Sequence, residues 1–409
     1  MSDTQSFDIL VVGGGMTGSA LALGLSQQGW KTALVESASA ASIMEDIAPA
    51  NTVHDFEPRV SAISVASQTL LESLGVWAHV DRHRHCPYQA MTVWDADGTG
   101  RIHFEAAELQ VRALGTIVEN RHLVQALFLG LAQSDAEIFD NTRVTGWWEQ
   151  GVQRGIRLED GRKISATLVV AADGGTSRLR QWVGLPTREW DYDQQAIVCT
   201  VETSQAHQFT AWQRFSTTGP LAFLPLQSES GSHHFCSIVW SQDTAAARRL
   251  MALDDGEFIS ALEKAIEQQL GDIHAVSKRF AFPLRQRHAK DYVRPGVALV
   301  GDAAHTIHPL AGQGANLGYS DVAVLLEELA RSRRLGLRPD DQQVLARYQR
   351  RRKGDNLAMM VTMEGFKQLF ARDELPLRWL RNTGMRWLDR ISPLKNRLAA
   401  EAMGLNRKG

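Results

Sequence analysis

The chain has 409 residues, of which 44% are apolar and 22% are charged. This composition is typical of a globular enzyme and excludes a disordered or fibrous protein, and the length predicts two lobes. Forty-four basic residues against 46 acidic residues leave a formal charge of −2. That balance supplies no positive field for a nucleic-acid partner, so we expect none.

The cysteines and the N-terminus bear on the cellular compartment. Cys86, Cys199 and Cys236 are far apart and form no CxxC motif, so they predict neither a disulfide framework nor a zinc site. Asp3 stands where a signal peptide would carry positive charge, and no run of 18 apolar residues occurs. We therefore expect a cytoplasmic protein that does not span a membrane.

The first forty residues predict a strand, a glycine turn, a helix and a second strand, at 7–12, 16–28 and 31–36. Gly13, Gly15 and Gly18 form a GxGxxG motif in the turn, where glycines permit a tight bend, a pyrophosphate contact and close helix packing. Glu36 ends the second strand, where a carboxylate binds a ribose diol. The unit predicts a dinucleotide site that could bind either FAD or NAD(P). NADP is the least favoured ligand, because the Glu36 carboxylate would repel its 2′-phosphate.

Two distant segments have the composition of ligand-binding turns. A predicted strand at 168–172 leads to Asp173, followed by a hydroxyl N-cap candidate and paired arginines. A second strand at 297–300 leads through a GDAAH turn into a glycine-rich loop at 308–318, before a helical pattern at 319–330. Small residues let this loop lie flat against a planar ligand, and a helix N-terminus favours negative charge there. The reduced isoalloxazine ring of a flavin fits that description.

These segments together are similar to the three fingerprints of the single-component flavin aromatic hydroxylases, the group that includes para-hydroxybenzoate hydroxylase. The string HPLAGQGANLGYSD, from His308 to Asp321, resembles the signature of the ubiquinone-biosynthesis hydroxylases of the UbiH, UbiF and VisC type. Shorter matches at 59–64 and 222–226 extend the resemblance over nearly the whole chain. Pieces such as Cys86-Pro87-Tyr88 look closest to the UbiF branch, which hydroxylates demethoxyubiquinol.

The resemblance implies an α/β fold in which a Rossmann-like FAD-binding lobe is interleaved with an antiparallel-sheet substrate lobe, as in para-hydroxybenzoate hydroxylase. We expect the FAD lobe at 1–75, 97–187 and 285–353, and the substrate lobe at 76–96 and 188–284. Short alternating runs at 196–201, 221–226 and 234–240 favour antiparallel strands in the second lobe. A basic amphipathic helical segment is expected at 354–409.

The resemblance also implies roles for individual residues. The glycines of GxGxxG would bind the FAD pyrophosphate, Glu36 the adenosine ribose and Asp302 the ribityl hydroxyls, while Asp173 and Arg178 would also meet NAD(P)H. The implied FAD contacts are Gly13, Gly15, Gly18, Glu36, Arg59, Asn120, Asp173 and Asp302, with the backbone of Gly314, Ala315 and Asn316 at the flavin N1–O2 edge. Pro309, Tyr192 and Arg214 are candidates for the substrate wall, and no catalytic residue is assigned.

The implied reaction uses FAD, NAD(P)H as electron donor and O₂ as co-substrate. A C4a-hydroperoxyflavin would transfer oxygen to the ring of a polyprenylated phenol or quinol, which needs no strong protein base once its own proton is partly removed. Another ring position, as in UbiH or VisC, and a non-catalytic flavin-bearing subunit of a ubiquinone-biosynthesis complex are the alternatives. A dehydrogenase would share GxGxxG but leaves the GDAAH turn unexplained.

Two further features admit a structural and a functional interpretation. His305 and His308 form an HxxH spacing, but no third ligand is evident, so we expect loop-fixing histidines and no metal. In the C-terminal segment Leu377, Trp379 and Trp387 alternate with arginines at helical spacing, as in helices that lie in a bilayer interface. Three roles remain open for this segment: peripheral contact with the inner face of the membrane, a cover over the FAD lobe, and a contact between subunits of a homo-oligomer.

Overall fold

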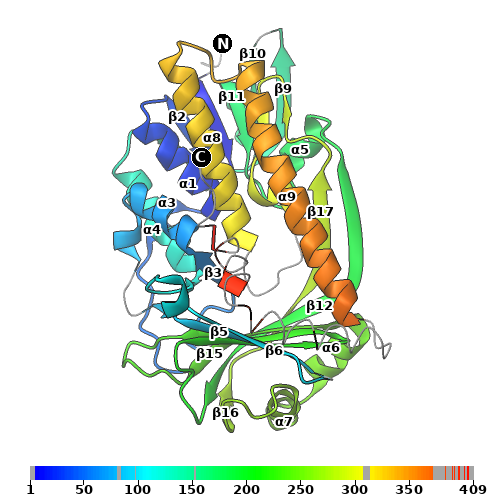
Figure 1. Ribbon diagram of the computed structural model, residues 1–409. Coiled ribbons are helices and arrows are strands. Elements are labelled where there is room, and N and C mark those ends of the chain that lie inside the picture. Colours follow the sequence, from blue (N-terminus) through cyan, green and yellow to red (C-terminus); the bar gives the residue numbers. More distant parts are fainter. Residues whose placement is uncertain are drawn as a thin grey trace.

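The computed structural model describes residues 5–80, 84–96, 98–151, 153–306 and 314–371, together with Thr383, Asp389, Ile391, Lys395, Asn396, Ala400, Met403 and Gly404. Two large sheets lie at opposite ends of the molecule, with a small sheet between them and two long helices alongside (Figure 1). The helices are α1 (Met16–Gln27), α2 (Ala40–Met44), α3 (Val65–Ser73), α4 (Asn120–Ala132), α5 (Arg178–Trp182), α6 (Thr244–Ala252), α7 (Asp255–Ala265), α8 (Gly314–Arg334) and α9 (Gln342–Ala371), with short 3-10 helices at Trp77–His79, Ala107–Leu109 and Gly301–Ala303.

The first sheet has a buried parallel core in the order β19-β11-β1-β2-β8. Its central strands are apolar without alternation because both faces are covered, and α1 is buried along most of its length. The predicted strand, helix and strand of the first forty residues are confirmed. The strands are β1 (Gln5–Val12), β2 (Thr32–Val35), β8 (Glu137–Phe139), β9 (Val144–Gln150), β10 (Gln153–Leu158), β11 (Lys163–Ala171), β18 (Val293–Arg294) and β19 (Val297–Leu299).

The second sheet has nine strands in the order β20-β17-β12-β15-β14-β13-β5-β6, with β16 beside β12. Its pairings are antiparallel except that β5 and β13 run parallel, which is possible because a long stretch of chain rather than a hairpin joins them. The strands are β5 (Ala90–Asp95), β6 (Arg101–Glu105), β12 (Thr187–Thr203), β13 (Thr210–Ser216), β14 (Gly219–Leu226), β15 (Phe235–Asp243), β16 (Ile273–Val276), β17 (Phe280–Ala289) and β20 (His305–Thr306).

The two faces of the second sheet have different neighbours. One face packs against α6 and α7 around Phe223, Ile238 and Phe258. The other packs against a three-stranded sheet in the order β3-β7-β4, which consists of β3 (Val60–Ser64), β7 (Gly115–Glu119) and β4 (His85–Tyr88). The lobe division expected at residue 96 falls between β5 and β6, and both strands belong to the second sheet.

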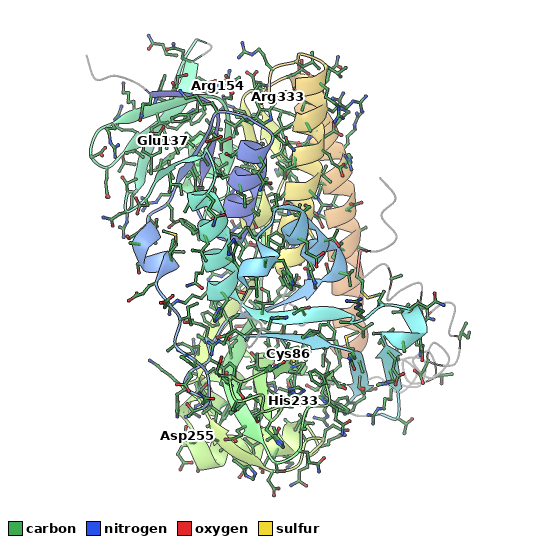
Figure 2. The ribbon with its side chains drawn as sticks, turned by 90° about the vertical axis from the view of Figure 1, so that its left-hand side faces the viewer. Cys86, Glu137, Arg154, His233, Asp255 and Arg333 are labelled. Atoms are coloured by element: carbon green, nitrogen blue, oxygen red, sulfur yellow. The ribbon has the colours of Figure 1, made fainter. Side chains whose placement is uncertain are left out.

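Side chains mark the two ends of the molecule. Figure 2 shows Glu137, Arg154 and Arg333 at the end that carries the first sheet, and His233 and Asp255 at the opposite end. The long strand β12 pairs with β17 from Thr187 to Val198, and both strands run from one end toward the other (Figure 1). The ligand site predicted from the sequence therefore has to be sought where the first sheet faces the middle of the molecule.

The C-terminal part of the chain contributes one long helix and a few described contacts. α9 extends to Ala371, whereas Leu377, Trp379 and Trp387 lie outside the described residues. Lys395 is buried against Glu108 at 2.9 Å, and Met403 is buried in the cluster between the second and third sheets. A search of the described residues finds no helix that is long and apolar enough to cross a bilayer.

Candidate functional site

The three motif glycines occupy different environments in the turn between β1 and α1. Gly13 has φ +106°, and a Cβ on Gly18 would lie 1.9 Å from its carbonyl oxygen. Gly15 is the N-cap of α1, and a Cβ there would have nothing within 4 Å. The first turn of α1 carries no acidic side chain. The turn therefore has a packed side and an open side, and the open side faces a helix N-terminus that favours an anion.

Glu36 lies at the end of β2 directly beside this turn. Its Oε2 accepts a hydrogen bond from the Gly14 amide at 2.6 Å, and its Oε1 accepts from the Ala38 amide at 2.8 Å and the Ser37 hydroxyl at 2.9 Å. These bonds fix a half-buried carboxylate without using all its lone pairs. The arrangement leaves acceptor capacity for a ribose hydroxyl.

Asp173 organises the turn after β11. Its carboxylate accepts from the Leu179 amide at 3.1 Å and from the Ser177 hydroxyl, and Ser177 caps α5 by accepting from the Arg180 amide at 2.9 Å. The predicted helix start is thus confirmed. The buried Arg180 donates to the Ala303 carbonyl at 2.8 Å. The Asp173 turn and the GDAAH turn are therefore joined directly.

Thr17 of α1 brings the GDAAH turn and α8 together. A Cβ on Gly301, which has φ +57°, would lie 2.9 Å from the Thr17 hydroxyl oxygen, and a Cβ on Gly318 would lie 2.4 Å from the same atom. Only glycine permits this approach at either position. Segments about 300 residues apart in the chain consequently meet at the start of α1.

Asp302 follows Gly301 and lies in a recess. The side chain is exposed to solvent, yet desolvation by the surrounding protein raises its pKa although His305 and Arg59 oppose the shift. A carboxyl group with both properties lines a hollow rather than an open surface. The Arg59 carbonyl accepts a hydrogen bond from the Asn120 amide at 2.9 Å. The Arg59 guanidinium lies 5.9 Å from the Phe282 ring centroid. Arg59 thus lies between the start of α4 and the second sheet.

The start of α8 has backbone N–H groups without a partner inside the helix. The helix begins at Gly314, so the amides of Gly314, Ala315 and Asn316 belong to its first turn, and a Cβ on Gly314 would meet nothing within 4 Å. The Asn316 side chain donates to the Ala62 carbonyl at 2.8 Å and accepts from the Ser64 amide at 2.9 Å. It binds the edge of β3 as a neighbouring strand would, which fixes the position of this helix N-terminus.

Other candidate residues lie elsewhere. Tyr192 donates to the Gln286 side chain within the β12–β17 ribbon. Arg214 donates to the Ala265 carbonyl at 2.8 Å, on the face of the second sheet that α7 covers, so the structure does not bring it to the residues above. Pro309 and His308 lie outside the described residues. Arg178 is exposed, whereas the buried Arg180 donates to the backbone carbonyls of Ala303 and Gly175.

His305 has a defined partner. Its Nε2 lies 2.6 Å from Oδ2 of the buried Asp321, which fixes the turn. Among the residues that the structure describes, no group of three potential ligands could hold a metal ion. Asp321 itself was not assigned a role from the sequence, although it stands in the string that carries the resemblance. The open side at Gly15, the recess at Asp302 and the first-turn amides of α8 fit the pyrophosphate, ribityl chain and ring of FAD.

Comparison with known proteins agrees with this geometry. Residues 6–361 match the family model described as FAD binding domain. The 3-demethoxyubiquinol 3-hydroxylase of Escherichia coli (strain K12) is 39% identical over 98% of this chain and 99% of its own length, and the ubiquinone hydroxylase UbiL of Rhodospirillum rubrum is 34% identical over 98% and 90%. The structure of the p-nitrophenol 4-monooxygenase PnpA from Pseudomonas putida DLL-E4 shares the fold, with a TM-score of 0.79 at 18% identity and coverage of 99% and 100%. The resemblance inferred from the sequence is confirmed, and the chain belongs to the FAD-binding monooxygenase family that includes the ubiquinone hydroxylases.

Proposed function

We propose that this chain hydroxylates the ring of a polyprenylated ubiquinone precursor, with demethoxyubiquinol as the substrate. The observation that carries the proposal is the 39% identity to a demethoxyubiquinol hydroxylase along nearly the whole length of both chains. Bound FAD, reduced by NAD(P)H, supplies the activation of O₂. The convergence of three distant segments on one recess supports a single flavin site.

The proposal assigns each part of that site a task. The open side at Gly15 and the N-terminus of α1 bind the pyrophosphate, Glu36 binds the ribose, and Asp302 binds the ribityl hydroxyls. The first-turn amides of α8 stabilise negative charge on the flavin ring. The remaining proposed FAD contacts are Gly13, Gly18, Arg59, Asn120, Asp173, Gly314, Ala315 and Asn316.

The second sheet supplies the substrate side in this proposal, so the lobe division expected from the sequence is retained with β6 added to the substrate lobe. The protein has to exclude water while the ring is oxidised, and the apolar packing between the second and third sheets supports such a closed wall. Tyr192 and Pro309 remain candidates for this wall. The hydrogen bond from Arg214 to α7 argues against Arg214 as a part of this wall. No side chain is assigned as a base.

The decisive experiment measures product. Purified protein with FAD, NAD(P)H, O₂ and a short-chain demethoxyubiquinol is expected to yield a quinol heavier by one oxygen atom, detected by mass spectrometry. Quinone profiling of a deletion strain identifies the ring position, because the accumulating precursor retains the carbon that was not oxidised. Bound FAD with NAD(P)H oxidation but no hydroxylated product from any ring analogue would contradict the proposal and favour a flavin-bearing subunit of a complex.

A polyprenylated substrate resides in a bilayer, so we also propose that the protein contacts the membrane surface. The support within the described residues is on α9, where Leu357 and Val361 are 42% and 71% exposed and lie one helical turn apart. Arg350 is exposed two turns before Leu357, whereas its neighbour Arg351 is paired with Glu327 and Glu328 of α8. An apolar pair beside positive charge is typical of a surface that binds anionic lipid.

A further inference from the structure

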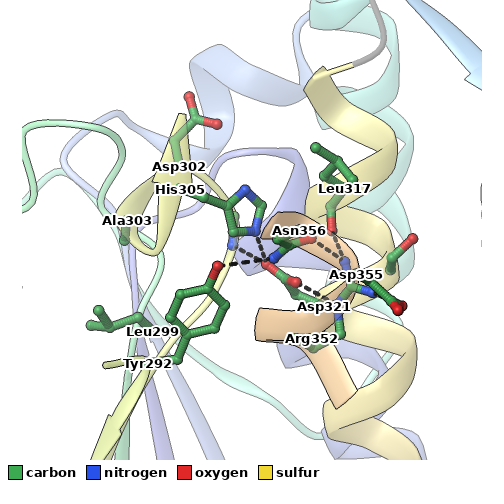
Figure 3. A network of polar contacts seen from close by, with 12 residues as sticks. Tyr292, Leu299, Asp302, Ala303, His305, Leu317, Asp321, Arg352, Asp355 and Asn356 are labelled. Carbon is green, nitrogen blue, oxygen red and sulfur yellow. Dashed lines mark hydrogen bonds and ion pairs between the residues drawn. The ribbon is translucent and has the colours of Figure 1, made fainter. Parts of the chain in front are cut away.

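A network of buried polar side chains joins the GDAAH turn to both long helices (Figure 3). Oδ2 of Asp321, on α8, accepts from the Gly301 amide at 2.9 Å and from His305 Nε2 at 2.6 Å. Oδ1 of Asp321 accepts from Nε of Arg352, on α9, at 2.7 Å. One carboxylate therefore fixes both ends of the turn that contains Asp302.

Arg352 is itself immobilised. Its Nη2 donates to the Asn356 side chain at 2.7 Å and its Nη1 to Asp355 at 3.0 Å, while Asn356 donates to the Tyr292 hydroxyl at 3.1 Å. All three guanidinium nitrogens thus have partners, and the planar fork can satisfy them together where a lysine could not. Arg352 and Asp321 are completely buried, so neither side chain touches a ligand in the recess.

The charges explain why the network depends on both partners. Burial opposes ionisation of Asp321, but His305 and Arg352 outweigh it and hold the pKa of this carboxyl below its ordinary value. Loss of Arg352 would leave a buried carboxylate with His305 as its remaining charged partner, which is more disruptive than loss of the whole Asp321–Arg352 pair. The position of the Gly301 amide, and with it Asp302, follows the position of Asp321.

We propose that Arg352 and Asp321 are positioning residues for FAD, because Arg352 fixes Asp321 and Asp321 fixes the turn that presents Asp302. The proposal rests on the proposed function for the contact between Asp302 and FAD. It assigns α9 an indirect part in cofactor binding, since no residue of that helix is a predicted FAD contact.

The first test compares two arginines that join α9 to α8. Arg347 binds Glu328 at 2.7 Å, five residues before Arg352, and does not contact the GDAAH turn. We expect R352M to raise the Kd of the apoprotein for FAD by about tenfold or more, measured by flavin fluorescence titration. R347M is expected to leave that Kd within about twofold. Equal changes in the two variants would overturn the proposal.

The second test separates positioning from stability and does not require R352M to fold. D321N/R352M and D321L/R352M both remove the buried charge pair. D321L/R352M also leaves the Gly301 amide and His305 without their acceptor, so its apoprotein Tm is expected to be lower, and both FAD affinities are measured well below the lower of the two Tm values. FAD affinity is expected to stay near that of the wild type only in D321N/R352M, because the D321N amide oxygen still accepts from the Gly301 amide. If FAD affinity is the same in both double variants, the network is merely structural. Wild-type protein that binds FAD without hydroxylating would contradict only the proposed function.

Discussion

Gly15 and Gly18 are three residues apart, but the structure constrains them differently. A Cβ on Gly18 would lie 1.9 Å from the Gly13 carbonyl oxygen and 2.9 Å from the Ala172 side chain, both in the packed side of the turn. Gly15 has ordinary φ of −70° and open space around its Cβ position. The same motif therefore contains one glycine that folding requires and one that only a ligand can require.

This difference predicts opposite results for two alanine variants. G15A is expected to keep the apoprotein Tm of the wild type and to weaken FAD binding by about tenfold or more, because the methyl group occupies the space that the pyrophosphate needs. G18A is expected to destabilise the apoprotein by about 2 kcal/mol or more through overpacking. Thermal unfolding and FAD titration of both apoproteins provide the measurement. A destabilised G15A, or a G18A as stable as the wild type, would contradict the assignment.

Residues at the ends of strands were predictable from the sequence, and residues that position them were not. Glu36, Asp173 and Asp302 each follow a predicted strand, so their placement near one edge of the sheet could be inferred. Arg180 and Arg352 act on partners 123 and 31 positions away in the chain, and no local pattern indicates those pairs. Arg178 is exposed and Arg180 is buried, a difference that depends on tertiary packing and that the sequence pattern does not show.

The turn between β12 and β13 depends on a buried histidine. Nε2 of His207 donates to the Leu226 carbonyl at 2.9 Å, and its Nδ1 accepts from the Phe209 amide at 3.0 Å. Both ring nitrogens are thus satisfied only in the neutral form. Burial, together with the neighbouring His233, lowers the pKa of His207 to about 4. Gln208 and Phe209 both have positive φ, and the two His207 side-chain bonds hold the backbone at Phe209 and Leu226.

The lowered pKa predicts a pH dependence for the second sheet. The unfolded chain binds a proton near pH 6.5 and the folded chain only near pH 4, so the stability that neutral His207 contributes is complete above pH 6.5 and is lost as the pH falls toward 4. Over this interval the free energy of unfolding is expected to fall with decreasing pH in both proteins. We expect the slope to be steeper in the wild type than in H207Q, by about 1 kcal/mol per pH unit. Urea unfolding at pH 7.5, 6 and 5 gives both slopes, and parallel slopes would refute the assignment.

The positions of periodic helices and strands could be predicted from the sequence, but the directions in which strands pair could not. The strands and helix of the first forty residues were located to within a few residues because each is a continuous apolar or helical pattern. α8 begins at Gly314 rather than 319, since its first turn consists of small residues without an apolar period. The parallel pairing of β5 with β13 depends on how distant segments meet, which local alternation does not encode.

The whole molecule is interleaved because one recess is formed from both ends of the chain. α1, the Asp173 turn and the GDAAH turn meet through Thr17 and Arg180, while the segment between them forms the second sheet. Ligand binding at such a junction stabilises all three segments together, since FAD contacts only the folded arrangement. The convergence of three separated motifs could be predicted, whereas the expected boundary at residue 96 separates β5 from β6 within one sheet. The role of α9 could not, because Arg352 lies in a stretch that resembles an ordinary charged helix surface.

The exposed apolar pair Leu357 and Val361 on α9 makes membrane binding of the whole protein testable. L357S/V361S is expected to reduce co-sedimentation with anionic liposomes by about tenfold in apparent affinity, because two exposed apolar side chains would no longer enter the bilayer interface. L335S/L337S is the matched control, since Leu335 and Leu337 are 61% and 36% exposed but precede the first turn of α9. FAD affinity and Tm should be unchanged in both variants. If both bind liposomes as the wild type does, α9 is not the membrane contact, and if both lose binding equally, the contact is not specific to Leu357 and Val361.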